Sequence, residues 1–315
     1  MNKEKVSVII PAYNAEMFIE RAIDSALNQT YNNIEVIVIN DGSVDETEKK
    51  VSAYVQKYEN VKLISTENGG VCQARNIGIE SSTGEYLTFL DADDEILPDA
   101  VEIMLETAIR ENADIVNAKK SEQYGVKEQE LSLTGEEYLV KCIEDHHIGY
   151  SSVRKLFKRS FLGDNIRFEV GKKIHEDSFF NFECALNQPK FIHIEKDSYK
   201  VYQTEGSASR GAFSEKYFDM LYFAEKKEEL INEKYPHLND KAINLRIKAN
   251  MALLSKMCSV NVKGYKKTEK ELIKYIIKNK KHFVPAIEFD KKWFSVIKHR
   301  MYFVYKFLYG LKHRG

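Results

Sequence analysis

Short apolar runs alternate with longer amphipathic segments along the first 120 residues. Runs rich in Val, Ile and Leu predict strands at residues 6–10, 34–40, 61–65, 86–90 and 113–118. Between them, apolar residues recur every three or four positions, which predicts helices at 15–29, 44–58 and 71–82. Pro98 is predicted to open a further helix, and Gly84 to close the third one as a left-handed cap. Near-continuous apolar strands separated by helices indicate an α/β fold with a mainly parallel sheet and helices on both faces.

Polar residues follow the first, second and fourth predicted strands, in the segments PAYN, NDGS and DADD. Ligands of parallel sheets bind at the carboxyl ends of the strands, so these segments are predicted to line one crevice. Asp91, Asp93 and Asp94 crowd the end of the fourth strand, where like charges repel and lose hydration. A bound cation would offset that cost. The alternative is a solvated loop with helix caps, and NDGS by itself equally fits a turn followed by a cap.

Composition and charge narrow the class of protein. The chain has 315 residues, enough for a domain of about 200 residues and an extension, and its formal net charge of -1 gives no global field for nucleic acid. No CxxC spacing links the four cysteines, which favours reduced thiols in a cytosolic protein over disulfides or zinc. No run resembles a signal peptide or approaches the roughly 20 apolar residues of a membrane span. No GxGxxG follows the first strand, which disfavours a dinucleotide-binding domain.

Three segments in combination resemble a known family. The stretch from VSVIIPAYNAE to NDGSVDET, then ENGGVCQARNIGI, then GEYLTFLDADD, is similar to the family 2 glycosyltransferases of the GT-A fold. The likeness is dense over about residues 4–120, thinner through 151–162 and 174–186, and fades after about residue 210. It implies a GT-A domain over residues 1–212, with a nucleotide-sugar half at about 1–120 and an acceptor half at about 121–212. Residues 213–315 would form a helical carboxyl-terminal region.

The resemblance gives the acidic cluster a role. Asp91-Ala92-Asp93 matches the DxD motif, which works with Mn²⁺ or Mg²⁺ on the diphosphate of a nucleotide sugar. These ions prefer hard oxygen ligands and keep coordination sites for phosphate oxygens and water. The resemblance makes Asp93 the direct metal ligand and puts Asp91 at the metal or the ribose, while the small Ala92 lets the ligand approach.

The other strand ends are assigned in the same way. The family pattern implies a nucleotide-binding wall at Pro11, Ala12 and Tyr13, with the Tyr13 ring offered to the base. Asp41 would accept a hydrogen bond from the base, and Asn68 begins a Gly-containing connection where backbone could approach the donor. Arg75 would meet the base or a phosphate, with a solvated helix charge as the alternative. The resemblance favours a UDP-sugar.

A transferase also needs a base for the acceptor hydroxyl. Asp177 occupies the family position of that base, and Glu176 is either the alternative base or a residue that orients the acceptor sugar. From composition alone, Asp177 would be a helix N-cap.

One position departs from the family pattern: Gln203 stands where many relatives carry a basic residue for the diphosphate, and Arg210 is the candidate substitute. The loop around Arg210 is either a flexible cover for the donor or a plain surface loop.

The carboxyl-terminal third has a different pattern. Helices are predicted at 216–234 and 243–258. Residues 291–315 carry Lys, Arg and His among many aromatic residues and no acid, which suits a helix on an anionic membrane surface. The alternative is a terminal helix packed on the domain.

These expectations combine into one functional hypothesis. The chain is predicted to be an inverting, metal-dependent glycosyltransferase that moves a sugar from a nucleotide donor to a glycan or lipid-linked acceptor, as in capsule synthesis by bacteria. It would be cytoplasmic and peripheral on the inner face of the cell membrane, with no nucleic-acid partner; a homo-oligomer is compatible with this hypothesis. One alternative is a catalytically silent glycan-binding or scaffold protein on the same fold. Another is a sugar nucleotidyltransferase, which would need a Gly-rich phosphate loop that PAYNAE lacks.

Overall fold

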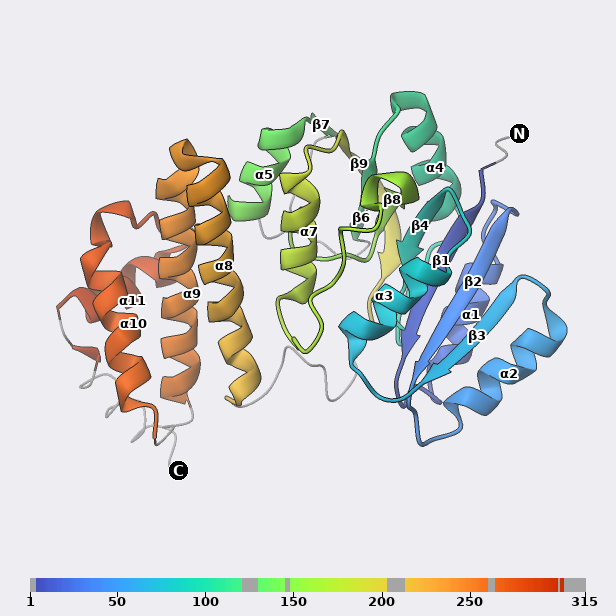
Figure 1. The fold of residues 1–315 in the computed structure, drawn as a ribbon, viewed down its shortest axis with the longest axis horizontal. Helices are drawn as coiled ribbons and strands as arrows, with labels where there is room; N and C mark the ends of the chain where they lie inside the picture. Colours follow the sequence, from blue (N-terminus) through green and yellow to red (C-terminus); the bar gives the residue numbers. More distant parts are fainter. Residues whose placement is uncertain are drawn as a thin grey trace. The chain divides into compact units, whose positions relative to one another are not determined.

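The computed structural model describes residues 4–120, 130–144, 148–202, 213–259, 264–299 and 301–302. The chain divides into two compact units, residues 1–205 and 206–315, which Figure 1 shows as an α/β unit and a helical unit. The prediction of separate donor and acceptor halves within the first unit stays a prediction.

The first unit is built on one nine-stranded sheet. Its strands are β1 (Val6–Ala12), β2 (Ile34–Asp41), β3 (Val61–Thr66), β4 (Tyr86–Phe89), β5 (Glu95–Ile96), β6 (Ile115–Lys120), β7 (Leu131–Leu133), β8 (Lys155–Lys158) and β9 (Phe191–Lys200). Its helices are α1 (Ile19–Leu27), α2 (Thr47–Lys57), α3 (Val71–Ser81), α4 (Ala100–Glu111), α5 (Gly135–Glu144), α6 (Arg159–Leu162) and α7 (Glu176–Leu186). The predicted strands at the amino end are all present, and β1 and β2 are buried along their whole length.

The strand order is β3-β2-β1-β4-β8-β6-β9-β5, with β7 on β9. β1 to β4 pair in parallel, β6 pairs in parallel with β9, and β8 is antiparallel to both of its neighbours. The chain winds outward from β1 to β3 and then returns to place β4 on the other side of β1. Such a reversal is the topological switch point at which α/β sheets bind ligands, outside the carboxyl ends of the strands.

Helices cover both faces of the sheet (Figure 1). The Thr30 N–H, just after α1, donates to the Pro98 carbonyl ahead of α4 at 2.8 Å, so α1 and α4 share a face. Right-handed crossovers place α3 on the opposite face. There α3 lies very close to β1, because an added Cβ at Gly78 would come within 2.2 Å of the Ile9 side chain. The close approach fixes α3, and with it Arg75, against the first strand.

Two local predictions at helix ends were wrong. α3 ends at Ser81 with Ser82 as its extended C-cap, so Gly84 is not a left-handed cap. Gly84 is needed for another reason: a Cβ there would lie 2.6 Å from the Lys5 carbonyl oxygen. Pro98 precedes α4 by two residues, and Asp99 is the N-cap.

The second unit is helical. Its helices are α8 (Phe218–Lys234), α9 (Asn239–Ser259), α10 (Lys266–Lys278) and α11 (Glu288–Lys298), with short 3₁₀ turns at Glu215–Tyr217, Pro236–Leu238 and Lys280–His282. α8 and α9 correspond to the two predicted helices. No helix within the described residues is both long and apolar enough to cross a membrane.

The described part of the basic, aromatic tail packs onto this helical unit. Trp293 and Ile297 of α11 are buried, and Trp293 Nε1 donates to the Met251 carbonyl at 3.0 Å. Tyr302 is also buried, and its hydroxyl donates to Glu269 Oε1 at 3.1 Å. For these residues the packed-helix alternative describes the structure. Residues 303–315 lie outside the described part, and membrane association stays a prediction.

Candidate active site

The first part of the site joins the end of β2 to the start of α3. Asp41 is buried, and its two carboxylate oxygens accept the Gly69 N–H at 2.7 Å and the Gly70 N–H at 2.9 Å. The Asn68 side chain donates to the Asp41 carbonyl oxygen at 3.0 Å. Asp41 and Asn68, both predicted donor residues, are therefore in contact. The loop that they form holds the amino end of α3 beside the carboxyl end of β2.

The residues predicted to form the nucleotide-binding wall lie at the carboxyl end of β1 and directly after it. Pro11 and Ala12 are buried as its last two residues, whereas the Tyr13 side chain is 54% exposed. An exposed aromatic ring directly after a central strand is free to stack on a flat ligand. The next residue, Asn14, holds the β2–α2 loop, since its side-chain oxygen accepts the Val44 N–H at 3.0 Å.

The second part of the site is the acidic turn, defined here as Asp91 to Glu95. Asp91 and Ala92 follow β4, and the Asp94 N–H donates to the Asp91 carbonyl at 3.1 Å, which closes the turn. Asp91, Ala92 and Asp93 are partly exposed, but Asp94 is buried. The main chain of Asp91 is fixed from β9, where the Tyr199 hydroxyl accepts its N–H at 3.0 Å.

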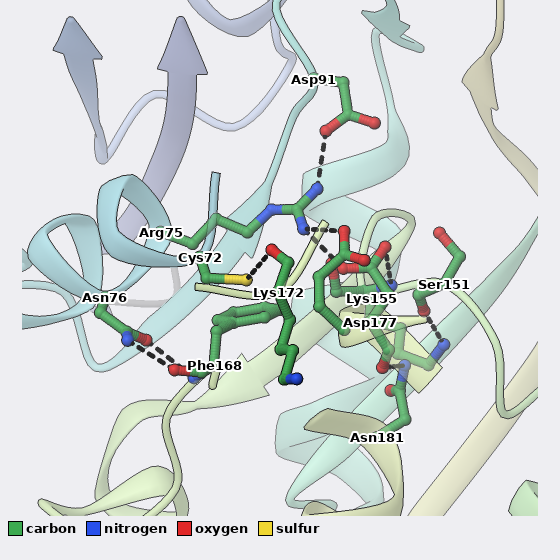
Figure 2. A network of polar contacts seen from close by, with 12 residues as sticks. Cys72, Arg75, Asn76, Asp91, Ser151, Lys155, Phe168, Lys172, Asp177 and Asn181 are labelled. Carbon is green, nitrogen blue, oxygen red and sulfur yellow. Dashed lines mark hydrogen bonds and ion pairs between the residues drawn. The ribbon is translucent and has the colours of Figure 1, made fainter. Parts of the chain in front are cut away.

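Arg75 connects the acidic turn to the segment proposed to hold the base (Figure 2). One of its terminal nitrogens donates to Asp91 Oδ1 at 3.0 Å and the other to Asp177 Oδ1 at 2.6 Å, with Glu176 Oε1 at 3.5 Å. Its side chain is only 4% exposed and lies over the Phe168 ring, 5.2 Å from the centroid. Arg75 is therefore a buried ion-pair centre, and the alternative of a solvated helix charge is wrong.

Asp177 is not the cap of its helix. His175, with φ at 64°, is the N-cap of α7, and Asp177 is the second helical residue. Besides Arg75, its carboxylate accepts the Ser152 hydroxyl at 2.9 Å and the Ser152 N–H at 3.3 Å. The carboxylate is thus directed into the site by contacts from α3 and from the loop before β8, which leaves the simple capping alternative without support.

Three carboxylates share the single Arg75 guanidinium, and their pKa values reflect it. Burial raises the pKa of Glu176 to about 7, and the Asp177 charge adds to the shift while Arg75 opposes it. Burial also raises the pKa of Asp91; Arg75 opposes this shift, and Asp177 and Asp93 reinforce it. Burial lowers the pKa of Arg75, but the three carboxylates outweigh this and raise it overall, so the guanidinium stays charged. These three carboxylates together carry more negative charge than the Arg75 guanidinium balances.

Sequence reasoning missed several residues that shape this site. Ser152 holds Asp177, and fully buried Lys155 donates to the Ser151 carbonyl of the same loop (Figure 2). Burial lowers the pKa of Lys155 to about 7, and the neighbouring Arg154 adds to the shift. A lysine inside an apolar strand, at KLF, was the one signal that could have drawn attention here. Gln203 and Arg210 lie outside the described residues.

Most of this site lies in a segment that a known protein family shares. A family model described as glycosyl transferase family 2 matches residues 7–164. The chain belongs to glycosyl transferase family 2. The match spans β1 to α6, and so it includes Asp41, Arg75 and the acidic turn but ends before α7. The resemblance inferred from the sequence is confirmed.

Curated relatives carry the same family name. Glycosyltransferase GlyA of Streptococcus pneumoniae is 32% identical over 253 residues, which is 74% of this chain and 36% of that protein. The uncharacterized glycosyltransferase YibD of Escherichia coli is 31% identical over 219 residues, 65% of this chain and 63% of that protein. The putative glycosyltransferase EpsH of Bacillus subtilis is 34% identical over 194 residues, 58% and 56% of the two chains. The chain thus matches less than two thirds of the length of each of these relatives.

Solved structures confirm the fold of this family 2 member. Residues 1–349 of S. aureus TarS, in complex with UDP-GlcNAc, superpose with a TM-score of 0.71 at 24% identity, covering 96% of this chain and 89% of that one. The mannosyltransferase PcManGT from Pyrobaculum calidifontis, in complex with GDP-Man and Mn²⁺, superposes with a TM-score of 0.58 at 15% identity, covering 100% and 89%. The expected α/β fold with added carboxyl-terminal helices is correct.

The family 2 fold implies a divalent metal, and the acidic turn has suitable chemistry for one. Asp91 and Asp93 supply hard carboxylate oxygens. Burial raises the pKa of Asp91, and repulsion from Asp177 and Asp93 reinforces the shift, so a bound cation would relieve repulsion there. Among the described residues, no group of three or more His, Cys, Asp or Glu side chains is arranged to hold a metal. Sites of this kind commonly use one or two carboxylates, with phosphate and water completing the coordination. The residues present therefore fit a metal that arrives with a diphosphate.

The raised pKa of Glu176 gives a testable pH dependence. A carboxyl group whose pKa is raised to about 7 on folding binds a proton more tightly in the folded state. The charged Glu176 carboxylate therefore destabilises the folded state. This destabilisation is fully present above about pH 7, where the group is ionised in both states, and it is lost as the pH falls toward about 4.5, the pKa of the unfolded chain. Without metal, Glu176→Gln should therefore raise the free energy of unfolding by about 2 kcal/mol at about pH 8 and change it little near pH 5.

Urea denaturation of both proteins at the two pH values measures this difference. Glu80→Gln is the matched control, because Glu80 lies on α3 with a side chain that is 64% exposed. An equal effect of Glu176→Gln at both pH values would contradict the assignment of a raised pKa to Glu176.

Proposed function

We propose that this family 2 member is an inverting, metal-dependent glycosyltransferase that moves a sugar from a nucleotide donor to a hydroxyl group of an acceptor. The observation that carries the proposal is the double pairing of Arg75, with Asp91 at 3.0 Å on one side and Asp177 at 2.6 Å on the other. A residue of the donor motif and a candidate base are thereby held within the span of one guanidinium. Such fixed spacing is what a single displacement between donor and acceptor requires.

On the donor side, the residues at the switch point suit a nucleoside diphosphate. Tyr13 offers an exposed ring for a base, and the Asp41–Gly69–Gly70 loop brings backbone close to the same edge of the sheet. Asp93 and Asp91 would hold Mn²⁺ or Mg²⁺. The bound cation would supply charge neutralisation for the leaving diphosphate.

On the acceptor side, Asp177 is the proposed general base. Its carboxylate receives the acceptor proton while Ser152 and Arg75 keep it oriented. Glu176, whose pKa is raised to about 7, is the residue proposed to orient the acceptor sugar. Attack by the acceptor opposite the leaving diphosphate inverts the anomeric carbon, so an α-linked donor gives a β-glycoside.

The donor and acceptor are proposed by likeness. TarS was solved with UDP-GlcNAc, which supports a UDP-sugar as donor. Curated relatives that match a shorter part of this chain include the chondroitin and hyaluronan synthases of Pasteurella multocida, each 41% identical over 106 residues. A growing glycan or a lipid-linked glycan of a bacterial surface polysaccharide is the proposed acceptor, at the inner face of the cell membrane.

Release of UDP from a panel of UDP-sugars, with Mn²⁺ and with EDTA, tests this function. Water can act as the acceptor, so the assay can be run before the natural acceptor is identified. We expect metal-dependent UDP release from at least one donor. Binding of UDP-sugar without any release, with water or with a lipid-linked acceptor pool, would favour the catalytically silent alternative.

Membrane association is tested with a shortened chain. Because Trp293 and Tyr302 are packed in the helical unit, the deletion must begin after Tyr302. Removing residues 303–315 should reduce sedimentation with anionic liposomes, and higher salt should reduce it in the full chain, since surface attraction is screened. UDP release should persist. Full sedimentation of the shortened chain would contradict a membrane role for this segment.

A further inference from the structure

Arg21 and Tyr202 surround the acidic turn with contacts that neither the predicted sequence roles nor the family match assigns. Arg21 lies on α1 and Tyr202 follows β9, yet the Arg21 guanidinium lies over the Tyr202 ring, 3.7 Å from its centroid. A cation this close to the face of an aromatic ring is attracted by the ring electrons, and partial burial strengthens that attraction. The two residues form a bridge over the turn from two separate elements.

Each partner of this bridge also holds the turn itself. A terminal nitrogen of Arg21 donates to the Asp93 carbonyl oxygen, and its Nε lies 3.5 Å from the Glu95 carboxylate. The Tyr202 N–H donates to Asp94 Oδ1 at 2.9 Å, and the Tyr202 hydroxyl donates to Glu95 Oε2 at 3.0 Å. Three consecutive residues after Ala92 are therefore fixed by Arg21 or Tyr202.

These contacts oppose the electrostatic repulsion between the carboxylates of the acidic turn. Asp91 and Asp93 carry like charges that repel when no cation is bound, and that repulsion favours a turn whose carboxylates splay apart. Asp94 is buried with its carboxylate bonded to the Tyr202 backbone, so it cannot turn outward with them. The contacts keep the carboxylates in place before a cation arrives, which lowers the ordering cost of binding.

We infer that Arg21 and Tyr202 are positioning residues for the acidic turn, and that they set how tightly this protein binds a divalent cation together with a nucleoside diphosphate. The inference rests on the proposed function. Neither side chain need touch the donor, since both act through the backbone of Asp93 and through Asp94 and Glu95.

The variants separate the contributions of the bridge. Arg21→Met removes the guanidinium and keeps an unbranched side chain on α1. Tyr202→Ala removes the ring and the hydroxyl, while Tyr202→Phe removes only the hydroxyl bond to Glu95 and keeps the ring under Arg21. Arg110→Met is the matched control, because Arg110 lies on α4 with a side chain that is 65% exposed and pairs with Glu111.

Calorimetry of UDP binding, with Mn²⁺ and with EDTA, measures the effect. In Mn²⁺, Arg21→Met and Tyr202→Ala should weaken UDP binding by about 10- to 100-fold, the range found when outer-shell partners of metal ligands are lost. Tyr202→Phe should lose about threefold, which is the weaker end of the range for the net contribution of a single hydrogen bond. In EDTA, all variants should bind UDP within about twofold of the parent protein, because the bridge acts on the metal-binding turn.

The outcomes are distinguishable. Unchanged UDP affinity in Mn²⁺ for both Arg21→Met and Tyr202→Ala would overturn the inference while leaving the proposed function intact. Equal weakening in Mn²⁺ and in EDTA would also overturn it, because it would indicate general distortion of the nucleotide site. If the parent protein binds UDP neither in Mn²⁺ nor in EDTA, the proposed function is wrong, and the inference fails with it. If the two severe variants do not fold, Tyr202→Phe decides by the same comparison.

Discussion

Replacing Asp177 with asparagine is expected to lower sugar transfer by about 10²- to 10⁴-fold, the usual scale for loss of a general base. The amide keeps the size of the side chain and an oxygen that accepts from Ser152, but it cannot take up the acceptor proton. Asp177 is the second residue of α7 and His175 is its N-cap, so the change does not remove a cap. The rate loss should therefore come from chemistry.

Donor affinity should respond differently from turnover. Arg75 keeps its bond to Asp91 at 3.0 Å when Asp177 is neutral, so UDP-sugar affinity should stay within about threefold of the parent value. Calorimetry gives the donor affinity, and UDP release at saturating donor gives the rate.

Two further variants serve as comparisons for Asp177→Asn. Asp164→Asn, at an exposed position of the same unit, is the control for the substitution itself. Glu176→Gln should have a milder effect on rate if Glu176 only orients the acceptor. Near-normal turnover of Asp177→Asn would move the base elsewhere, first to Glu176.

Removal of divalent metal is expected to abolish turnover, and Mn²⁺ or Mg²⁺ should restore it. The reason is that three carboxylates share the Arg75 guanidinium, while Arg21 is held by the Asp93 carbonyl and the Glu95 carboxylate. A divalent cation is therefore needed to neutralise a diphosphate at the acidic turn. Asp93→Ala should weaken UDP binding by about 10- to 100-fold when metal is present. Without metal, the same change should remove repulsion and leave UDP affinity equal or slightly higher.

Calorimetric titration of UDP into parent and Asp93→Ala proteins, each with Mn²⁺ and with EDTA, provides the four affinities. Asp164→Ala, again at an exposed position, controls for the loss of an acidic side chain. Equal UDP affinity of the parent protein in Mn²⁺ and in EDTA would be incompatible with a metal-bridged diphosphate.

The two groups of predictions address different halves of one site. Asp177 and Glu176 are expected to change the rate with little effect on the donor, whereas Asp93, Arg21 and Tyr202 are expected to change donor affinity through the metal. The Arg75 side chain contacts both halves. Its removal would strand buried carboxylates and is therefore a poor test of either role, since a lost partner in a buried ion pair typically costs about 3–5 kcal/mol.

The amino-acid sequence by itself determined the frame of this protein. Apolar runs such as those at β1 and β2 are buried along their whole length, and so the pattern of neighbouring residues was enough to predict strands and a covered sheet. The positions of Asp41 and Asp91 at the ends of strands could also be predicted from the residues next to them in the sequence. The ends of helices were harder to predict from the sequence. Glycine is a residue type common at helix C-caps, but Gly84 is required because it approaches the Lys5 carbonyl, and Lys5 is far away in the chain.

Only the tertiary structure decided how the charged residues pair. Arg75 meets Asp91, 16 positions away, and Asp177, 102 positions away, because α3 and the start of α7 both lie beside the end of β4. Arg21 meets Tyr202 because β9 is inserted between β6 and β5, next to the acidic turn. Hydrophobic periodicity reports which face of a single element is buried, and a charged residue on the other face gives no sign of its partner. The order of strands in the sheet brings these partners together, and that order is a property of the whole fold.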